Sequence, residues 1–286
     1  MQIRTDLAIE SEKIHSLKMK AILQNVRTYK NFKVVKIEIK TAKQARILKR
    51  PVGVYITIIS EQMLTVQNSD DAQFLLKREL SQFLKRKNSI LLVGLGNDSI
   101  CCDSIGPKVV QKVIATRHVR QNLMKSLRLL QLPSVSVISP GVLGQTGIET
   151  FEIVKALVGK LRPDIIIVVD ALAAASIDRL GSTIQLTNTG IAPGSGVGNG
   201  RKELSSRVLN VPVLAIGVPT VVDLDERCKI HFKLGGQFNK NLSKFMMITP
   251  KNVDEVVESA RNVIAGAINS VVFPMLSKQD LAALNY

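Results

Sequence analysis

The sequence predicts an α/β fold: a three-layer sandwich with a mostly parallel central sheet, helices on both faces and a small N-terminal antiparallel element. Strand patterns alternate with helix patterns from residue 89 onward, which is typical of a parallel sheet. The strand patterns at 89–96 and 164–172 are apolar runs, as expected where both faces of a sheet are covered. The 286 residues, 45% of them hydrophobic, supply enough apolar side chains for a large core.

The N-terminal third predicts two paired strands and a helix. Residues 1–30 are polar and weakly patterned. Residues 31–39 alternate apolar and charged side chains, and residues 52–60 form a second strand pattern. We expect these two strands to pair antiparallel. Residues 70–86 carry apolar side chains at helical spacing, with acidic residues at the start, where the helix dipole favours them.

Strands and helices then alternate to the C-terminus. A helix is predicted over 105–124, where Pro107 is tolerated because it falls in the first turn. Two further helices are predicted, over 147–161 and over 249–272. No internal repeat or low-complexity linker divides the chain, so we expect one α/β domain. The strands predicted in this part are 89–96, 134–140, 164–172, 182–187 and 211–219.

Composition limits the classes of function. The net charge of +16 suits a nucleic-acid partner, an anionic membrane surface, an acidic substrate, or a lysine-rich surface without a specific partner. The densest basic clusters, 43–50 and 77–87, lack interleaved aromatic side chains for base stacking. Three cysteines without a spacing pattern, and no apolar stretch of membrane length or secretory signal, indicate a cytoplasmic protein. With three histidines and no C-x-x-C pattern, a zinc site is not expected.

Two glycine-rich loops follow predicted strands. The loop 94–107, GLGNDSICCDSIGP, has the layout of a phosphate-binding loop. It lacks the third glycine of the dinucleotide fingerprint, where Ser99 stands, and the closing Gly-Lys-Ser/Thr of a P-loop, so nucleotide binding is not expected. The second loop, 189–202, ends in Arg201 and Lys202 and is either an anion site or a flexible surface loop.

Two aspartates mark a candidate active site. Asp103 follows the strand that ends near Val93, and Asp170 ends the apolar run 165–169. Ligand sites in open parallel sheets lie beyond the carboxyl ends of the strands, so the two carboxyl groups are expected at one edge. Alone, each could be only a helix cap or a turn residue. As a pair they can share a proton, so that one activates water while the other protonates a scissile carbonyl.

Serine and cysteine nucleophiles are less favoured. No G-x-S-x-G elbow occurs in the sequence. Cys101 and Cys102 lie in the same loop as Asp103, but His118 lies about four helical turns further along the predicted helix. This spacing is too long for His118 to serve as their base.

The chain resembles the spore germination protease family, endopeptidases that degrade small acid-soluble spore proteins when an endospore germinates. The resemblance implies an unusual aspartic-type protease without a required metal or other cofactor, related in fold to the hydrogenase maturation endopeptidases. It also implies that Asp103 and Asp170 are the acting acids. The matching words stand in the family's order: IRTDLAIE (3–10), VGLGN (93–97), DSIGP (103–107), TRHV (116–119), PGVLGQTGIET (140–150), PDIIIVVDALAA (163–174), TIQLTNTGIAPGSGVGNGRKELS (183–205), GVPTVVD (217–223) and MMITPKNVD (246–254).

The resemblance further implies a zymogen that removes a short propeptide by self-cleavage and assembles as a tetramer in the forespore or spore core. Family substrates are cut after an acid that is followed by an apolar residue, alanine, a variable residue and a second acid. Residues 5–10 have this order, so cleavage is predicted between Asp6 and Leu7. Residues 1–6 would be the propeptide and 7–286 the single α/β protease domain. Residues expected to shape the cleft are Gly96, Asn97, Gly141, Gly147, Glu149, Gly194, Gly196 and Gly198.

Two other functions remain open. One is a metal-dependent maturation endopeptidase of the hydrogenase-protease type, in which the acids and a histidine would position a nickel-type ion. The other is a non-catalytic basic module that binds DNA or protein. Cys101 and Cys102 also stand where the family commonly has Thr-Pro, and the segment 224–245 is shorter than in the longer relatives.

Overall fold

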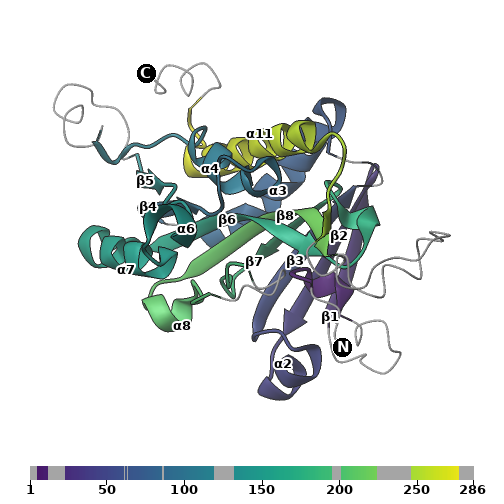
Figure 1. The fold of residues 1–286 in the computed structure, drawn as a ribbon, viewed down its shortest axis with the longest axis horizontal. Coiled ribbons are helices and arrows are strands. Elements are labelled where there is room, and N and C mark those ends of the chain that lie inside the picture. The colour runs from purple at the N-terminus through teal and green to yellow at the C-terminus, as the bar shows by residue number, and fades with distance from the viewer. Residues whose placement is uncertain are drawn as a thin grey trace.

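The computed structural model describes residues 5–11, 23–60, 62, 64–85, 87–118, 132–194, 201–223 and 246–276. Within them, one nine-stranded sheet has the order β1-β2-β3-β7-β8-β6-β4-β5, with β9 paired to β8 (Figure 1). The strands are β1 (Leu23–Tyr29), β2 (Phe32–Ile39), β3 (Gly53–Ser60), β4 (Ser89–Gly94), β5 (Ser134–Ile138), β6 (Ile165–Ala174), β7 (Thr183–Thr187), β8 (Val213–Asp223) and β9 (Met247–Ile248). The α-helices are α2 (Ala42–Leu48), α3 (Ser69–Leu84), α4 (Ile105–Val110), α6 (Leu143–Thr146), α7 (Thr150–Leu161), α8 (Ser206–Leu209) and α11 (Val253–Val272), and the 3-10 helices are η1 (Ala8–Glu10), η2 (Val66–Asn68), η3 (Cys101–Asp103) and η4 (Ile177–Arg179).

The sheet has a parallel half and an antiparallel half. Strands β5, β4, β6 and β8 are parallel neighbours, whereas β8, β7, β3, β2 and β1 pair antiparallel. The predicted α/β class with helices on both faces is confirmed, and β2 and β3 form the predicted antiparallel pair. The antiparallel part is larger than the small element predicted, because β1 and β7 extend it within the same sheet.

Three local predictions are corrected. The helix predicted over 105–124 ends at Val110, because Asn269 of α11 accepts the N–H of Ile114 (3.1 Å) and the N–H of Thr116 bonds to β5. The last part of that prediction, 119–124, lies outside the described residues. The weakly patterned N-terminal region contains β1, and α2 was not predicted. A capping box between Thr41 and Gln44 begins α2.

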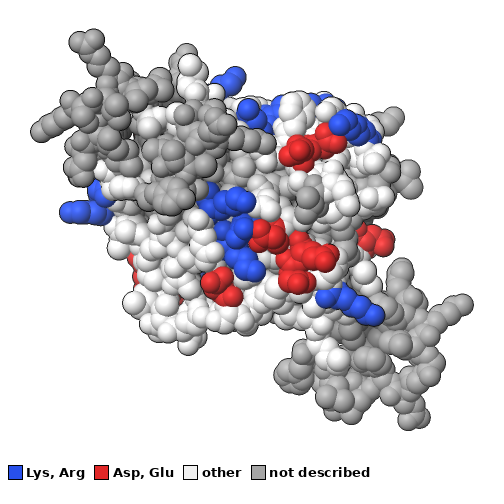
Figure 2. All heavy atoms as spheres, turned by 90° about the horizontal axis from the view of Figure 1, so that it is seen from above, with Lys and Arg blue, Asp and Glu red and all other residues white. Residues whose placement is uncertain are grey.

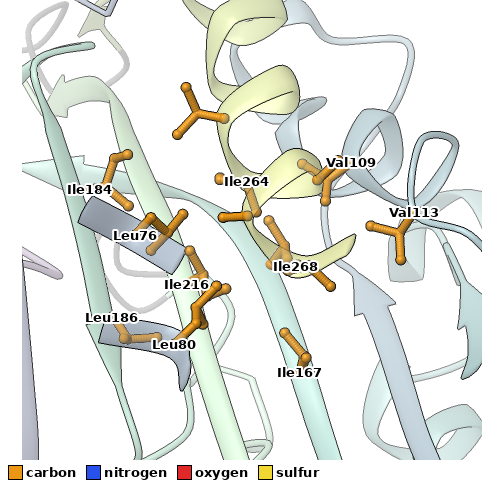
Figure 3. Close-up of a cluster of buried hydrophobic side chains, with 14 of the residues drawn as sticks. Leu76, Leu80, Val109, Val113, Ile167, Ile184, Leu186, Ile216, Ile264 and Ile268 are labelled. Atoms are coloured by element: carbon orange, nitrogen blue, oxygen red, sulfur yellow. The ribbon is translucent and has the colours of Figure 1, made fainter. Parts of the chain in front are cut away.

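The larger part of the core lies between the sheet and the helices α3, α4 and α11 (Figure 3). Helices α3 and α11 pack against each other on this face. Their buried residues recur at helical spacing, as Leu76 and Leu80 on α3 and Ile264 and Ile268 on α11 illustrate. The strands beneath contribute every second residue, such as Ile184 of β7, because side chains alternate between the faces of a sheet.

The opposite face of the sheet is covered in two parts. Helices α7 and α8 pack over the parallel half, against Val168 of β6. Residues 7–9 and Leu48 of α2 pack with Leu172 of β6, further along the same strand. Because side chains alternate along β6, Asp170 lies on this face, between the two parts. The sheet thus places the N-terminal segment on the same face as Asp170.

Candidate active site

Asp103 is held inside the loop that joins β4 to α4. The backbone N–H of Asn97 donates to Asp103 Oδ2 at 2.8 Å. Gly96 has φ +109, and a Cβ added there would lie 2.0 Å from the carbonyl oxygen of Asp103, so the loop closes tightly around this residue. Ser104, not Asp103, occupies the N-cap of α4. The helix-cap alternative for Asp103 is therefore wrong.

Asp170 belongs to β6 and lies inside that strand, next to the point where the neighbouring strand β4 ends. The β4–β6 pairing ends at Gly94 opposite Val169, whereas β6 continues beside β8 to Ala174. The Asp170 side chain is only 7% exposed, and its Oδ1 accepts the N–H of Ala171 at 2.9 Å. The last residues of β6 therefore extend past the carboxyl end of β4, on the side where a crevice was predicted.

Asp103 lies close enough to Asp170 to affect the ionisation of the Asp170 carboxyl group. Burial raises the pKa of Asp170 well above its ordinary value, and the charges of Asp103 and Asp6 raise it further. Burial also raises the pKa of Asp103, but the N–H of Asn97 and the charge of Arg201 oppose that shift. Asp170 is therefore the better site for a shared proton, and Asp103 the better site for the negative charge.

Residues 5–10 lie beside the end of β6, with Leu7 in an extended conformation and Ala8–Glu10 forming the 3-10 helix η1. The N–H of Asp6 donates to the Ala173 carbonyl, and the N–H of Ala173 donates to Asp6 Oδ2, both at 2.9 Å. The Glu10 carboxylate accepts the N–H groups of Ala175 (2.7 Å) and Ser176 (3.0 Å). Ala173 near the end of β6 and the two residues that follow the strand thus bind two acidic side chains, four positions apart, through backbone donors.

Two side chains bind the backbone of this segment. Gln185 of β7 donates from Nε2 to the Asp6 carbonyl (2.9 Å), and its Oε1 accepts the N–H of Ala8 (2.6 Å). Arg50, which follows α2, donates to the carbonyls of Thr5 and Leu7. Leu7 and Ala8 are buried. Both peptide groups that flank Leu7 are therefore bound by the protein.

Sequence reasoning missed Gln185 and Arg50. A signal for Gln185 was available, because Thr183, Gln185 and Thr187 place three polar residues on one face of a strand whose other face is apolar. Arg50 stands in the basic cluster 43–50, and nothing in that cluster distinguishes it from its neighbours.

The loops predicted to shape the cleft meet at Asp103. Gln145 of α6 donates from Nε2 to Asn97 Oδ1 at 2.7 Å, which joins the Gly141–Gly147 loop to the loop of Asp103. Gly141 and Gly147 both have left-handed backbone. Arg201, at the end of the loop 189–202, acts electrostatically on Asp103. Of the remaining residues, Glu149 stands at the N-cap of α7 without a side-chain cap, Gly194 has φ +70, and Gly196 and Gly198 lie outside the described residues.

Other chemistry finds less support at this site. Burial and the nearby Asp103 raise the pKa of Cys102, which favours the thiol over the nucleophilic thiolate. Among the described residues, no three His, Cys, Asp or Glu side chains are grouped to hold a metal ion.

The described part of the chain contains no helix long and apolar enough to cross a membrane.

The described surface around α11 is not uniformly basic. Figure 2 shows the molecule from above the view of Figure 1, where α11 lies, and its Lys and Arg side chains stand beside groups of Asp and Glu. One example is Arg261, which pairs with Glu258 within α11. The net charge of the chain is therefore not expressed as one unbroken basic patch on the described part of this face.

Comparison with known proteins supplies the family. The sequence pattern of the germination protease family matches residues 3–230. The chain belongs to the germination protease family. The germination protease of Clostridium tetani is 37% identical over 98% of both chains, and that of Clostridium perfringens strain 13 is 34% identical over 98% of both chains. The germination protease of Oceanobacillus iheyensis is 41% identical over 78% of this chain and 64% of its own. Family membership makes this chain a peptidase, with proteins as its substrates.

The solved structures that match include the crystal structure of a [NiFe] hydrogenase maturation protease, HycI, from Thermococcus kodakarensis, with a TM-score of 0.40 and 17% sequence identity. The match covers 68% of this chain and 98% of that chain.

The burial of Asp170 predicts a pH-dependent stability in this germination protease family member. Its raised pKa means that the folded state binds the proton more tightly than the unfolded chain, whose carboxyl titrates near 3.8. Stability is therefore lost as pH rises from about 4 through the raised pKa. Asp170→Asn removes the charge and keeps an acceptor for the N–H of Ala171.

We expect the double variant Asp103→Asn, Asp170→Asn to melt roughly 2–4 °C above Asp103→Asn at pH 7, and at the same temperature at pH 4. Both chains are expected to stay uncleaved, so they can be compared at equal length. Thermal unfolding followed by circular dichroism measures the difference. A gap that does not change with pH would contradict this prediction.

Proposed function

We propose that this chain is an aspartic-type endopeptidase that begins the degradation of small acid-soluble spore proteins during germination. It is made as a zymogen and cleaves itself between Asp6 and Leu7. Residues 1–6 are then a propeptide, and residues 7–286 form a single protease domain. The observation that carries this proposal is the position of residues 5–10, which are bound as a peptide along the end of β6.

The two carboxyl groups divide the chemistry according to their surroundings. Asp103, ionised, takes a proton from a water molecule whose oxygen attacks the carbonyl carbon of Asp6. Asp170, protonated, gives its proton to the carbonyl oxygen, and a tetrahedral diol forms. The C–N bond then breaks as Asp103 passes its proton to the Leu7 nitrogen and Asp170 recovers a proton from a hydroxyl group. Each acid ends in its starting state, so no further reactant is needed.

The contacts of residues 5–10 account for the cleavage pattern expected of the substrates. An acid before the cut meets the N–H of Ala173, and an acid four residues later meets Ala175 and Ser176. The apolar residue and the alanine between them correspond to Leu7 and Ala8, which are buried. A spore protein with this order of residues would take the place of the N-terminal segment.

The setting of the reaction follows from the family resemblance. We propose that the enzyme acts in the spore core, formed in the forespore cytoplasm, as a homo-tetramer without a metal or other cofactor. Its net charge of +16 would attract acidic cleavage sites. Contact with the DNA that the spore proteins coat is a second role for the same charge.

The proposal is tested by mapping the cut. Purified full-length chain is brought to mildly acidic pH, and the products are identified by mass spectrometry and N-terminal sequencing. We expect a new chain that begins at Leu7. A small acid-soluble spore protein added to that product should be cut after an acidic residue. A new chain that begins at any other residue would refute the assignment of Asp6 and Leu7.

The same assay separates the alternatives. A chelator such as EDTA should leave the rate unchanged, whereas a metal-dependent maturation peptidase would lose activity. A non-catalytic binding module would cleave neither itself nor a spore protein, and would show only salt-dependent binding to DNA.

A further inference from the structure

The Asp6 carbonyl, which belongs to the proposed scissile bond, has a side-chain hydrogen-bond donor. Gln185 Nε2 lies 2.9 Å from this oxygen. The Gln185 side chain is buried, with only 6% of its surface exposed, so the bond is shielded from water. Asp170 and Gln185 both pair with Gly217 of β8, one from each side, so they lie on the same row of the sheet. The sheet therefore places this donor level with Asp170, whose ionisation is affected by the charge of Asp6.

The orientation of the Gln185 amide follows from its two partners. The N–H of Ala8 lies 2.6 Å from Oε1, and a donor can only face an acceptor. The other end of the amide must then be the NH₂ group, facing the Asp6 carbonyl. A flipped amide would oppose two donors on one side and two acceptors on the other. Gln185 thus holds the peptide on both sides of the Asp6–Leu7 bond.

The Gln185 side-chain amide is not needed to hold β7 in the sheet. The backbone of Gln185 already pairs with Thr57 and Gly217. Within the described part of the chain, the hydrogen bonds of its side chain go to residues 6 and 8 alone. A buried amide without partners costs stability, so a purely structural position would favour an apolar residue. The amide is matched to a peptide that lies in the site.

We propose that Gln185 is a catalytic residue that donates from Nε2 to the carbonyl oxygen of the residue before the cut, while Oε1 positions the chain beyond it. This deepens the proposed function and rests on it. A carbonyl oxygen has two lone pairs, so the bond from Gln185 leaves one for the proton of Asp170. As water adds, negative charge moves to this oxygen and the hydrogen bond strengthens. Removal of such a donor costs roughly 10²–10³ in rate.

The substitution Gln185→Glu distinguishes the role of the Nε2 donor from that of the Oε1 acceptor. The introduced carboxylate still accepts the N–H of Ala8 but presents no donor to the Asp6 carbonyl. The first-order rate of self-cleavage of the full-length chain should fall at least about 100-fold at neutral pH. The gap to the wild type should narrow as pH falls, because the protonated carboxyl group can donate again. Hydrogen exchange of the Ala8 N–H should stay slow.

Two further variants complete the test. Gln185→Met fills the same space without polar atoms, so cleavage should be slow at every pH and the Ala8 N–H should exchange faster. Gln44→Glu is the matched control, because it adds the same negative charge at the start of α2. The introduced carboxylate still accepts the N–H groups of Lys40 and Thr41, and these contacts do not involve the scissile bond. This control variant should cleave at the wild-type rate.

Cleavage by Gln185→Glu within about threefold of the wild-type rate, or a loss that does not change with pH, would overturn the inference; the reference loss is the 10²-fold expected for a missing donor. Equal loss of Ala8 protection in the Glu and Met variants would also overturn it, since docking alone would then explain the rates. Asp103→Asn and Asp170→Asn are measured alongside. If they are inactive while Gln185→Glu is fully active, only the role of Gln185 fails. If either cleaves normally, the proposed function fails too.

Discussion

Replacing Asp170 by asparagine is expected to stop self-cleavage between Asp6 and Leu7. Asparagine has nearly the same shape and can still accept the N–H of Ala171, but it has no proton to give to the carbonyl oxygen. General acid–base groups contribute about 10²–10⁴ in rate, and in the proposed mechanism the same group acts in both the addition and the breakdown step. We expect a fall of roughly 10³-fold or more in the first-order rate, measured by mass spectrometry of the full-length chain.

Asp103→Asn should cause a loss of the same order, because the remaining amide cannot take a proton from water. The matched control is Asp71→Asn on α3, which removes a partly exposed carboxylate that pairs with Lys30. It should cleave at the wild-type rate. Circular dichroism should show the same fold in all three variants. Full cleavage by either active-site variant would remove the basis for an aspartic-type mechanism.

The approximate position of the two acids could be predicted from the sequence because a general rule of sheets governs it. Parallel strands bring the segments that follow them to one edge, and β4 and β6 are parallel neighbours. What the rule could not supply was the length of β6, which runs four residues beyond Asp170. Ala173 among them provides the backbone donor for Asp6, and the next two residues, Ala175 and Ser176, provide those for Glu10, so the strand extends the site beyond the edge that the rule predicts.

The partners of the N-terminal segment could not be predicted, because they depend on contacts between distant parts of the chain. Gln185 meets Asp6 only after β7 has joined the antiparallel half of the sheet to the parallel half. Arg50 reaches Thr5 from the end of α2, a helix that the sequence pattern did not reveal. The prediction of the length of α4 was wrong for a similar reason, because the Asn269 side chain of α11 binds the backbone of Lys112 and Ile114, just beyond the end of α4.

Gly106→Ala is expected to have the largest effect on stability. Gly106 lies in the first turn of α4, where a Cβ would meet the carbonyl oxygen of Leu95 at 2.2 Å and that of Val169 at 2.6 Å. Both are backbone atoms, so relief requires α4 to move away from β4 and β6. We expect the free energy of unfolding to fall by about 3 kcal/mol or more. The melting temperature should fall by roughly 6–12 °C.

This variant also connects the fold to the chemistry, because Gly106 is the point where the loop of Asp103 touches the strand of Asp170. A shift of α4 would move Asp103 relative to Asp170, and misplacement of about 1 Å can cost 10²-fold in rate. Cleavage by Gly106→Ala should therefore fall by more than its unfolded fraction explains. Gly159→Ala on α7 is the matched control, since a Cβ there meets nothing within 4 Å. It should raise stability by about 0.5–1 kcal/mol and leave cleavage unchanged. Equal stability of the two alanine variants would show that α4 does not pack closely against the strands at Gly106.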